Sequence, residues 1–406
     1  MSAVVSYRAL LRIVGPAYVF VAFLGRLPLA MSQLGTLLLV SSATGRYALG
    51  GAAAGTLAVA NAVGAPLAGA LADRLGQRPV VLVQSWAGAA GLVGIVAVVG
   101  PDAHEALVLG FAVLTGLAVP QIGPLARVRW RPITRDEKGQ RQLVDAAFSY
   151  EGAADEASFV LGPALVGLLA VLADPGGALL SGALLLAVFG SWFALHPTGR
   201  LVEQLAGSRS RDDGRVVTGV FLVLVVAQVC VGTIFGSIQT GTTVLATEQG
   251  HAAAAGLLHA LLGVGSVIAG LAVAALPERI GYGRRMLVAA SGLLLLSWPL
   301  LLVHSIGALV VVILLLGFAV APFMIGTFAL AGHLVPPRRV GTAMTLLAGA
   351  TGIGYAIGSS VAGRLADAGG YTPAFVVTVS AAALAVVVSG GSQRPLRAAG
   401  QAGAAG

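Results

Sequence analysis

Four ionisable side chains stand inside long apolar stretches of this sequence. Arg26 lies in the first stretch, and Glu151, Asp155 and Glu156 lie in the fifth. Ionisable residues in such stretches are costly to bury, which makes them candidates for function. Glu151 and Asp155 are spaced i, i+4 and share a helix face, whereas Glu156 is turned by about 100° from Asp155. One acid can therefore pair with Arg26 while another faces a different neighbour.

The depth of these residues also allows them to meet. If the first helix begins near Arg12 and the fifth near Gln142, then Arg26 and the acids at 155 and 156 all lie about 20 Å along their helices. Protonation of one carboxylate would weaken its pair with Arg26, which is a physical route from proton binding to a change of state. The alternative is a purely structural set of salt bridges.

The elements that carry these residues are membrane helices. Hydrophobic residues make up 57% of the chain and charged residues 10%, with a mean hydropathy of +0.92, which exceeds the needs of a soluble core. Apolar runs of about 20 residues recur along the sequence, and lipid forces such runs to be helical. We expect an all-α membrane protein with twelve transmembrane helices in two pseudo-symmetric six-helix bundles. The expected spans are 11–41, 47–71, 79–100, 106–125, 143–172, 178–195, 216–246, 252–276, 286–303, 306–334, 341–365 and 372–389.

The polar segments divide the chain. We expect a first bundle at 1–196, a solvated linker at 197–215, a second bundle at 216–390 and a tail at 391–406. Most of the 24 Lys and Arg residues fall on the side shared by both termini, which predicts that this side is cytoplasmic. The basic residues are scattered through short loops, so the net charge of +8 does not indicate nucleic-acid binding. The pattern predicts a multi-pass protein of the cytoplasmic (inner) membrane, monomeric and surrounded by lipid.

The connection after the second span combines glycines with charges. Its candidate gate residues are Gly69, Asp73, Arg74, Gly76 and Arg78. A carboxylate at a helix end can lie against the positive N-terminus of another helix, and residues 341–342, which open the eleventh span, are the candidate partner of Asp73. The two arginines would add charge-assisted contacts. The simpler interpretation is a tight hairpin whose charges only fix topology. A related run, 278–281, follows the eighth span.

These residues resemble the major facilitator superfamily. Six plus six spans, cytoplasmic termini and a longer central connection fit that family over nearly the whole chain. Its loop signature is matched at Gly69, Leu71, Ala72, Asp73, Arg74, Gly76 and Arg78, whereas Gln77 departs from it. The fifth span resembles the glycine-rich signature of drug/proton antiporters at Gly162, Pro163 and Gly167, with Ser149 and Ser158 in place of glycines, and residues 115–124 lack the arginine of that group's fourth span.

Other polar positions offer weaker signals. Gln33, Gln228, Gln239 and His259 are candidate cavity residues, although each could instead bond or pack against neighbouring helices. His259 would titrate near neutrality if it faced water. The basic run 127–131 ends the fourth span. We expect it at the cytoplasmic surface, where it binds anionic lipid headgroups or contributes to a gate.

The sequence contains no enzymatic constellation. It has no phosphate-binding glycine loop and only one cysteine, Cys230, so we expect neither catalysis nor a cofactor or metal. The expected function is secondary transport of a small hydrophobic or amphipathic organic solute, outward in exchange for protons. One alternative is a proton-coupled importer of an organic anion, in which Arg26 is free to bind the anion. The other is a non-transporting membrane sensor or scaffold.

Overall fold

The computed structural model describes residues 3–45, 47–100, 104–207, 216–251, 255–277, 280–336 and 339–396. Within these ranges the chain is helical and contains no strand. The first part holds α1 (Ala3–Leu24), α2 (Leu27–Thr44), α3 (Tyr47–Leu75), α4 (Gln77–Val98), α5 (Glu105–Ala118), α6 (Ile122–Ile133), α7 (Gln140–Leu172), α8 (Pro175–Leu185), a π-helical turn (Leu186–Gly190), α9 (Ser191–Leu195) and α10 (Thr198–Gly207). The second part holds α11 (Gly219–Glu248), α12 (Ala255–Val273), α13 (Tyr282–Ser297), a 3-10 turn (Trp298–Leu302), α14 (Ile306–Leu334), α15 (Val340–Gly369) and α16 (Tyr371–Gly391).

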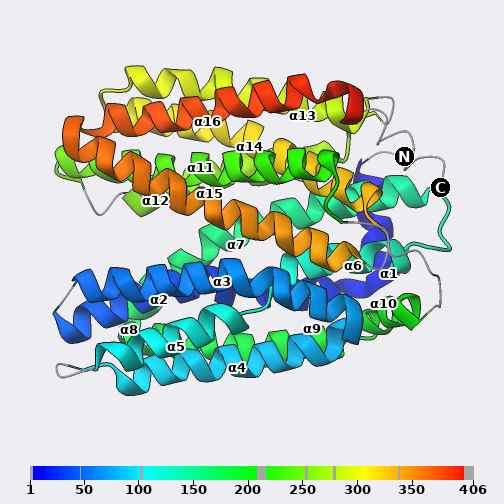
Figure 1. Cartoon of the computed structure of the whole chain (residues 1–406), viewed down its shortest axis with the longest axis horizontal. Helices are drawn as coiled ribbons and strands as arrows, with labels where there is room; N and C mark the ends of the chain where they lie inside the picture. Colours follow the sequence, from blue (N-terminus) through cyan, green and yellow to red (C-terminus); the bar gives the residue numbers. More distant parts are fainter. Residues whose placement is uncertain are drawn as a thin grey trace.

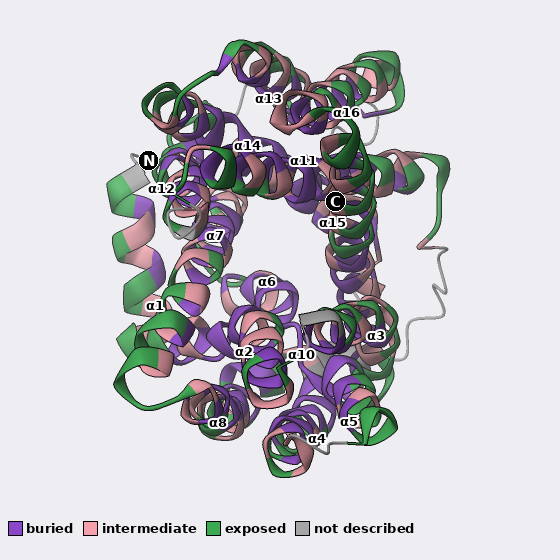
Figure 2. Cartoon of the chain, turned by 90° about the vertical axis from the view of Figure 1, so that its left-hand side faces the viewer, coloured by how far each residue is buried: buried purple, intermediate pink, exposed green. Residues whose placement is uncertain are grey.

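The helices form two bundles that lie side by side (Figure 1). Seen end-on in Figure 2, α11, α13, α14 and α16 lie on one side, and α2, α4, α5 and α8 lie on the other. The bundles meet along two flanks, α3 against α15 and α7 against α12. We call the end at which α1 begins and α16 ends the terminal face; it is on the right in Figure 1. The α3–α4 hairpin and the start of α15 also lie there.

The membrane spans agree with the expected all-helical fold. In the described part of the chain, eleven helical segments are long and apolar enough to cross a membrane, and a shorter apolar helix occupies 257–273, where we expected a span at 252–276. Several expected spans are broken helices. The first is split at Gly25 and Arg26, because Pro28 has no amide hydrogen to continue the helix. The fourth is split between Ala118 and Ile122 around Pro120 for the same reason.

The segments at the terminal face differ from the sequence expectation. Helix α1 begins at Ala3, changes direction at Gly15, whose φ is 75°, and its first turns run across the other helices in Figure 1. The Tyr7 hydroxyl donates to the Leu271 carbonyl of α12 at 2.8 Å, so this segment connects the bundles. The first part of the expected linker is the helix α10, which packs on α6 and α4; residues 208–215 lie outside the described ranges, and the linker stays a prediction.

Glycines allow the tightest helix packing. On α15, a Cβ at Gly354 would collide with the Val229 backbone of α11, and one at Gly358 would collide with the Thr233 backbone. On α11, Gly232 and Gly236 are matched in the same way against the α15 backbone. Small residues therefore set the distance between these two helices, as is usual in membranes.

This packing predicts opposite outcomes for two neighbouring glycines. Gly354→Ala should lower the apparent unfolding temperature in detergent by several degrees, because overpacking a tight contact costs about 1–3 kcal/mol. Gly352→Ala is the matched control: it lies two residues away, where an added Cβ meets nothing within 4 Å, and should leave the temperature unchanged or slightly raised. Equal effects of the two substitutions would contradict the packing argument.

Candidate functional site

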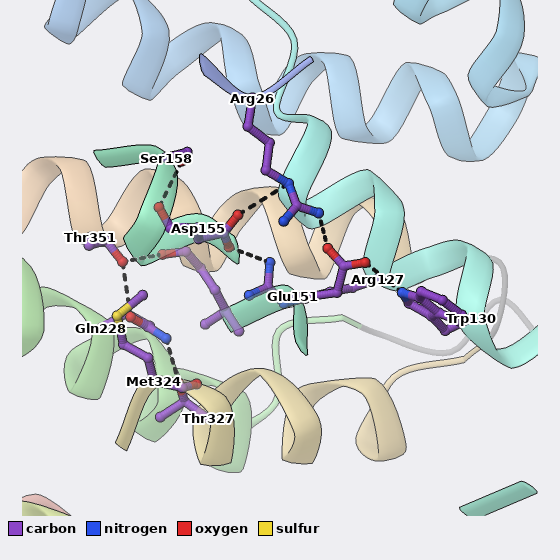
Figure 3. Close-up of polar contacts among 11 residues, drawn as sticks. Arg26, Arg127, Trp130, Glu151, Asp155, Ser158, Gln228, Met324, Thr327 and Thr351 are labelled. Atoms are coloured by element: carbon purple, nitrogen blue, oxygen red, sulfur yellow. Dashed lines mark hydrogen bonds and ion pairs between the residues drawn. The ribbon is translucent and has the colours of Figure 1, made fainter. Parts of the chain in front are cut away.

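Arg26 occupies the break between α1 and α2, and its guanidinium points to α7 (Figure 3). Its Nη2 donates to Glu151 Oε2 in a buried ion pair, and its Nε lies 3.5 Å from Asp155 Oδ1. The expected meeting of the first-span arginine with the fifth-span acids is therefore present. Glu151 and Asp155 share one face of α7, as their i, i+4 spacing requires.

A second arginine, Arg127 of α6, completes the cluster. Its Nη1 lies 2.7 Å from Asp155 Oδ2, and its guanidinium stacks over the Phe328 ring of α14 at 4.4 Å. The Asp155 carboxylate approaches α6 where Gly123 leaves room, since a Cβ there would collide with it. The charges of Arg26 and Arg127 are thus neutralised by Glu151 and Asp155 inside the first bundle. Arg127 also connects this cluster to the second bundle, through its contact with Phe328.

The run 127–131 is not at the surface, which corrects our expectation. Arg127, Arg129 and Trp130 are each at most 1% exposed. The Trp130 indole donates to Glu151 Oε1 at 2.6 Å (Figure 3). Arg129 donates to Gln77 Oε1 at 2.8 Å and to the Phe193 carbonyl at 2.9 Å. The α5–α6 break separates this run from the rest of the fourth span and places it among the helices of the first bundle.

Glu156 faces away from the arginines. It is 6% exposed, lies beside Ser266 of α12, and its carbonyl approaches Gly263 of the same helix. Among the described residues it forms no ion pair, unlike Glu151 and Asp155. The 100° turn expected from the sequence therefore places this carboxyl group at the α7–α12 flank between the bundles.

The polar residues of the second bundle form their own network. Gln228 of α11 is fully buried, donates to the Thr327 hydroxyl and accepts from the Thr351 hydroxyl at 2.9 Å. Gln239 accepts from the Tyr355 hydroxyl.

Gln33 is exposed on α2, and His259 is half-buried on α12. Their roles in binding a solute stay predictions.

Asp73 joins the two bundles at the terminal face. Its carboxylate accepts from the backbone N–H of Gly341 at 3.0 Å and of Thr342 at 2.7 Å, and from the Thr342 hydroxyl at 2.6 Å. These amides open α15 and have no helical carbonyl partner of their own, so Asp73 caps a helix of the other bundle. The expected contact is present.

The glycines of the hairpin make this contact possible. Gly69 lets α3 approach α15, because a Cβ there would collide with the Thr345 side chain. Gly76 has a φ of 89°, a left-handed value that favours glycine.

The charge-assisted contacts expected of Arg74 and Arg78 are not found. Both side chains are exposed, and neither forms a hydrogen bond or ion pair within the described part of the chain. Gln77, where the family signature has a basic residue, instead accepts from Arg129; a cation there would repel that arginine.

The cluster predicts strong coupling between Arg26 and Glu151. Removing one partner of a buried pair leaves an uncompensated charge and costs about 3–5 kcal/mol, so Arg26→Met and Glu151→Gln should each destabilise the protein. The double variant should lose clearly less than the sum of the two, by about 1–3 kcal/mol. Apparent unfolding free energies in mixed micelles measure the cycle. The exposed pair Arg135→Met and Glu137→Gln is the control and should be additive; additivity at 26 and 151 would show that the ion pair contributes nothing.

Comparisons with known proteins agree with this architecture. No curated protein matches the sequence significantly. The human organic anion transporter MFSD10 (TETRAN) is 21% identical, with 93% of this chain and 99% of that chain covered and a TM-score of 0.71. A bacterial homologue of the iron transporter ferroportin in an outward-facing state is 16% identical, with 91% and 98% covered and a TM-score of 0.66. The family model of the Major Facilitator Superfamily matches residues 14–314 and 224–391, and the chain belongs to that family of membrane transporters.

Proposed function

We propose that this transporter exchanges protons for a small hydrophobic or amphipathic organic solute, with outward movement of the solute, and that the terminal face is cytoplasmic. The observation that carries the proposal is Glu156, a buried carboxyl group without an ion-pair partner in the described chain, placed between the two bundles. The concentration of Lys and Arg on the terminal face supports the orientation.

The chemistry of the cluster supports proton coupling at Glu156 in preference to its neighbours. Protonating Glu151 or Asp155 would break contacts with Arg26, Arg127 or Trp130. Glu156 can bind a proton without breaking an ion pair. Because it lies against α12, a change in the distance between α7 and α12 alters its surroundings, and a buried charge is far costlier than a hydrated one. Proton binding and bundle movement are thereby coupled.

A second candidate is transport of an organic anion, the activity named for human MFSD10. Two arginines at the cluster favour it. In this conformation, however, Arg26 is paired with Glu151 and Arg127 with Asp155, so an anion would have to displace a carboxylate. A non-transporting sensor is the third candidate, and the Asp73 contact, which depends on the conformation at the bundle interface, favours transport over it.

Substrate identification precedes the transport test. Thermal stabilisation by a ligand reports binding whatever the ligand's chemistry, so a panel of amphipathic organic cations, neutral compounds and aromatic carboxylates separates the first two candidates. The binding compound is then used for flux into proteoliposomes with and without a pH gradient.

Glu156→Gln should abolish the pH-driven part of this flux. Accumulation should fall to the level reached without a gradient, because glutamine cannot carry a proton, while exchange of labelled for unlabelled solute continues. Glu137→Gln, in the exposed α6–α7 turn, is the matched control and should accumulate solute normally. If the Glu156 variant still responds to the pH gradient, this residue is not the proton carrier.

Asp73→Asn should slow transport without preventing membrane insertion. The neutral amide loses charge-assisted hydrogen bonds to α15, which are worth about 1.5–3 kcal/mol each, so the state with the terminal face closed becomes less populated. Initial uptake rate is the measurement, with yield and elution profile as the test of insertion. Asp136 is an exposed acid, and the control variant Asp136→Asn should transport at the wild-type rate. A wild-type rate for Asp73→Asn as well would contradict a role of Asp73 in gating.

A further inference from the structure

A chain of polar side chains crosses between the bundles at the terminal face, away from Asp73. It runs from Arg131 of α6 to His333 of α14, then to Tyr282 of α13 and Asp145 of α7. The Arg131 guanidinium contacts His333 Nδ1 at 2.7 Å, and His333 Nε2 contacts the Tyr282 hydroxyl at 2.8 Å. Tyr282 donates to Asp145. We call these four residues the His333 chain.

Donor and acceptor chemistry fixes the state of His333 in this arrangement. A guanidinium can only donate, so Nδ1 must present its lone pair to Arg131. The Tyr282 hydroxyl uses its hydrogen on Asp145 and must therefore accept from Nε2–H. Both requirements select the same neutral tautomer, so neutral His333 is satisfied at both ring nitrogens and bonds the first bundle to the second.

A proton on Nδ1 would reverse the Arg131 contact. Two hydrogen-bond donors and two positive charges would then face each other at 2.7 Å. Asp145 offers only partial compensation, because its Oδ1 lies 4.0 Å from Nε2 and is already held by Tyr282. The remaining charges nearby, Arg141 and Arg285, lie over the Tyr282 ring at 6.0 and 5.5 Å.

Among the described residues, Asp145 is the acid that lies against His333. Next to it on α14, Gly332 packs against Phe148 of α7 and Met344 of α15, both apolar. Within the described ranges, the charged groups placed around the imidazole are the Asp145 carboxylate and the three arginines already named, so a proton gains no new ion partner among them.

We infer that His333 is a second proton-binding site, distinct from Glu156, and that its protonation opens the terminal face. The hydrogen bond from Arg131 to His333, which joins α6 to α14, exists only while His333 is neutral. Loss of the Arg131 bond and its replacement by repulsion shift the closed-to-open ratio by about tenfold, the effect of one charge-assisted hydrogen bond. A low pH at the terminal face then favours the conformation in which that face is open.

Spin-label distances between the bundles test the inference without substrate or gradient. Arg78→Cys and Arg284→Cys, both exposed at the terminal face, carry the labels in a Cys230→Ala background. Double electron–electron resonance of the full chain in lipid nanodiscs is recorded between about pH 8 and about pH 5, which spans histidine titration. The population with the longer separation should rise about tenfold as the pH falls.

Variants separate His333 from every other titrating group. The variants are compared in a Glu156→Gln background, which removes the other proposed proton site. There His333→Gln, which offers an acceptor and a donor but no charge, should abolish the pH response, and Arg131→Gln should reduce it by removing the repulsion. If His333→Gln does not elute as a folded protein, Arg131→Gln carries the test.

The matched control is His196→Gln. His196 lies at the same face, and its contacts within the described part of the chain are with Thr198 and the Tyr18 ring, on the side of the first bundle. Burial, and then Arg129, lower its pKa. Its variant should respond like the parent. A wild type without a pH response, or a response retained in both the His333 and Arg131 variants, would overturn the inference. Because no solute is involved, failure of proton exchange at Glu156 would leave this result unaffected.

Discussion

The structure depends on neutralising charge inside an apolar bundle. Arg26 and Arg127 can be buried only because Glu151 and Asp155 lie between them, and Trp130 satisfies the remaining Glu151 oxygen. A buried ion pair of this kind is weak evidence that the protein is stabilised, but removing one partner strongly destabilises the protein, because the other charge stays buried and uncompensated. They therefore fix how α2, α6 and α7 sit relative to one another, and they leave Glu156 as the acid turned toward the second bundle.

Helix breaks place these charges. The Pro28 break brings Arg26 to a turn from which its side chain reaches α7, and the Pro120 break separates α5 from α6. The backbone groups that the second break releases are bonded by side chains: the Asn61 amide donates to the Gly116 carbonyl at 3.0 Å and accepts from Gln121 at 2.7 Å. Gln121, which lies in the stretch that lacks the antiporter arginine, thus has a structural partner.

The sequence predicted the fold class, the Asp73 contact and the pairing of Arg26 with the fifth-span acids, because membrane periodicity and helix geometry determine depth and face. It did not predict Arg127 as a member of the cluster. A basic residue near the end of an apolar run looks like a topology signal, and only the break at Pro120 distinguishes a buried arginine from a surface one. The His333 chain was missed because its four members come from four different helices and share no spacing.

The two contacts at the terminal face act on different flanks. Asp73 joins α3 to α15, and the His333 chain joins α6 and α7 to α13 and α14. Two bundles held at one flank alone can still rotate about it, so closure of this face requires both. The first contact is a carboxylate on a helix N-terminus and the second includes a neutral imidazole, so the two differ in chemistry as well as in place. A protein closed by both opens when either is lost, so a proton on His333 is enough to open this face while Asp73 still caps α15.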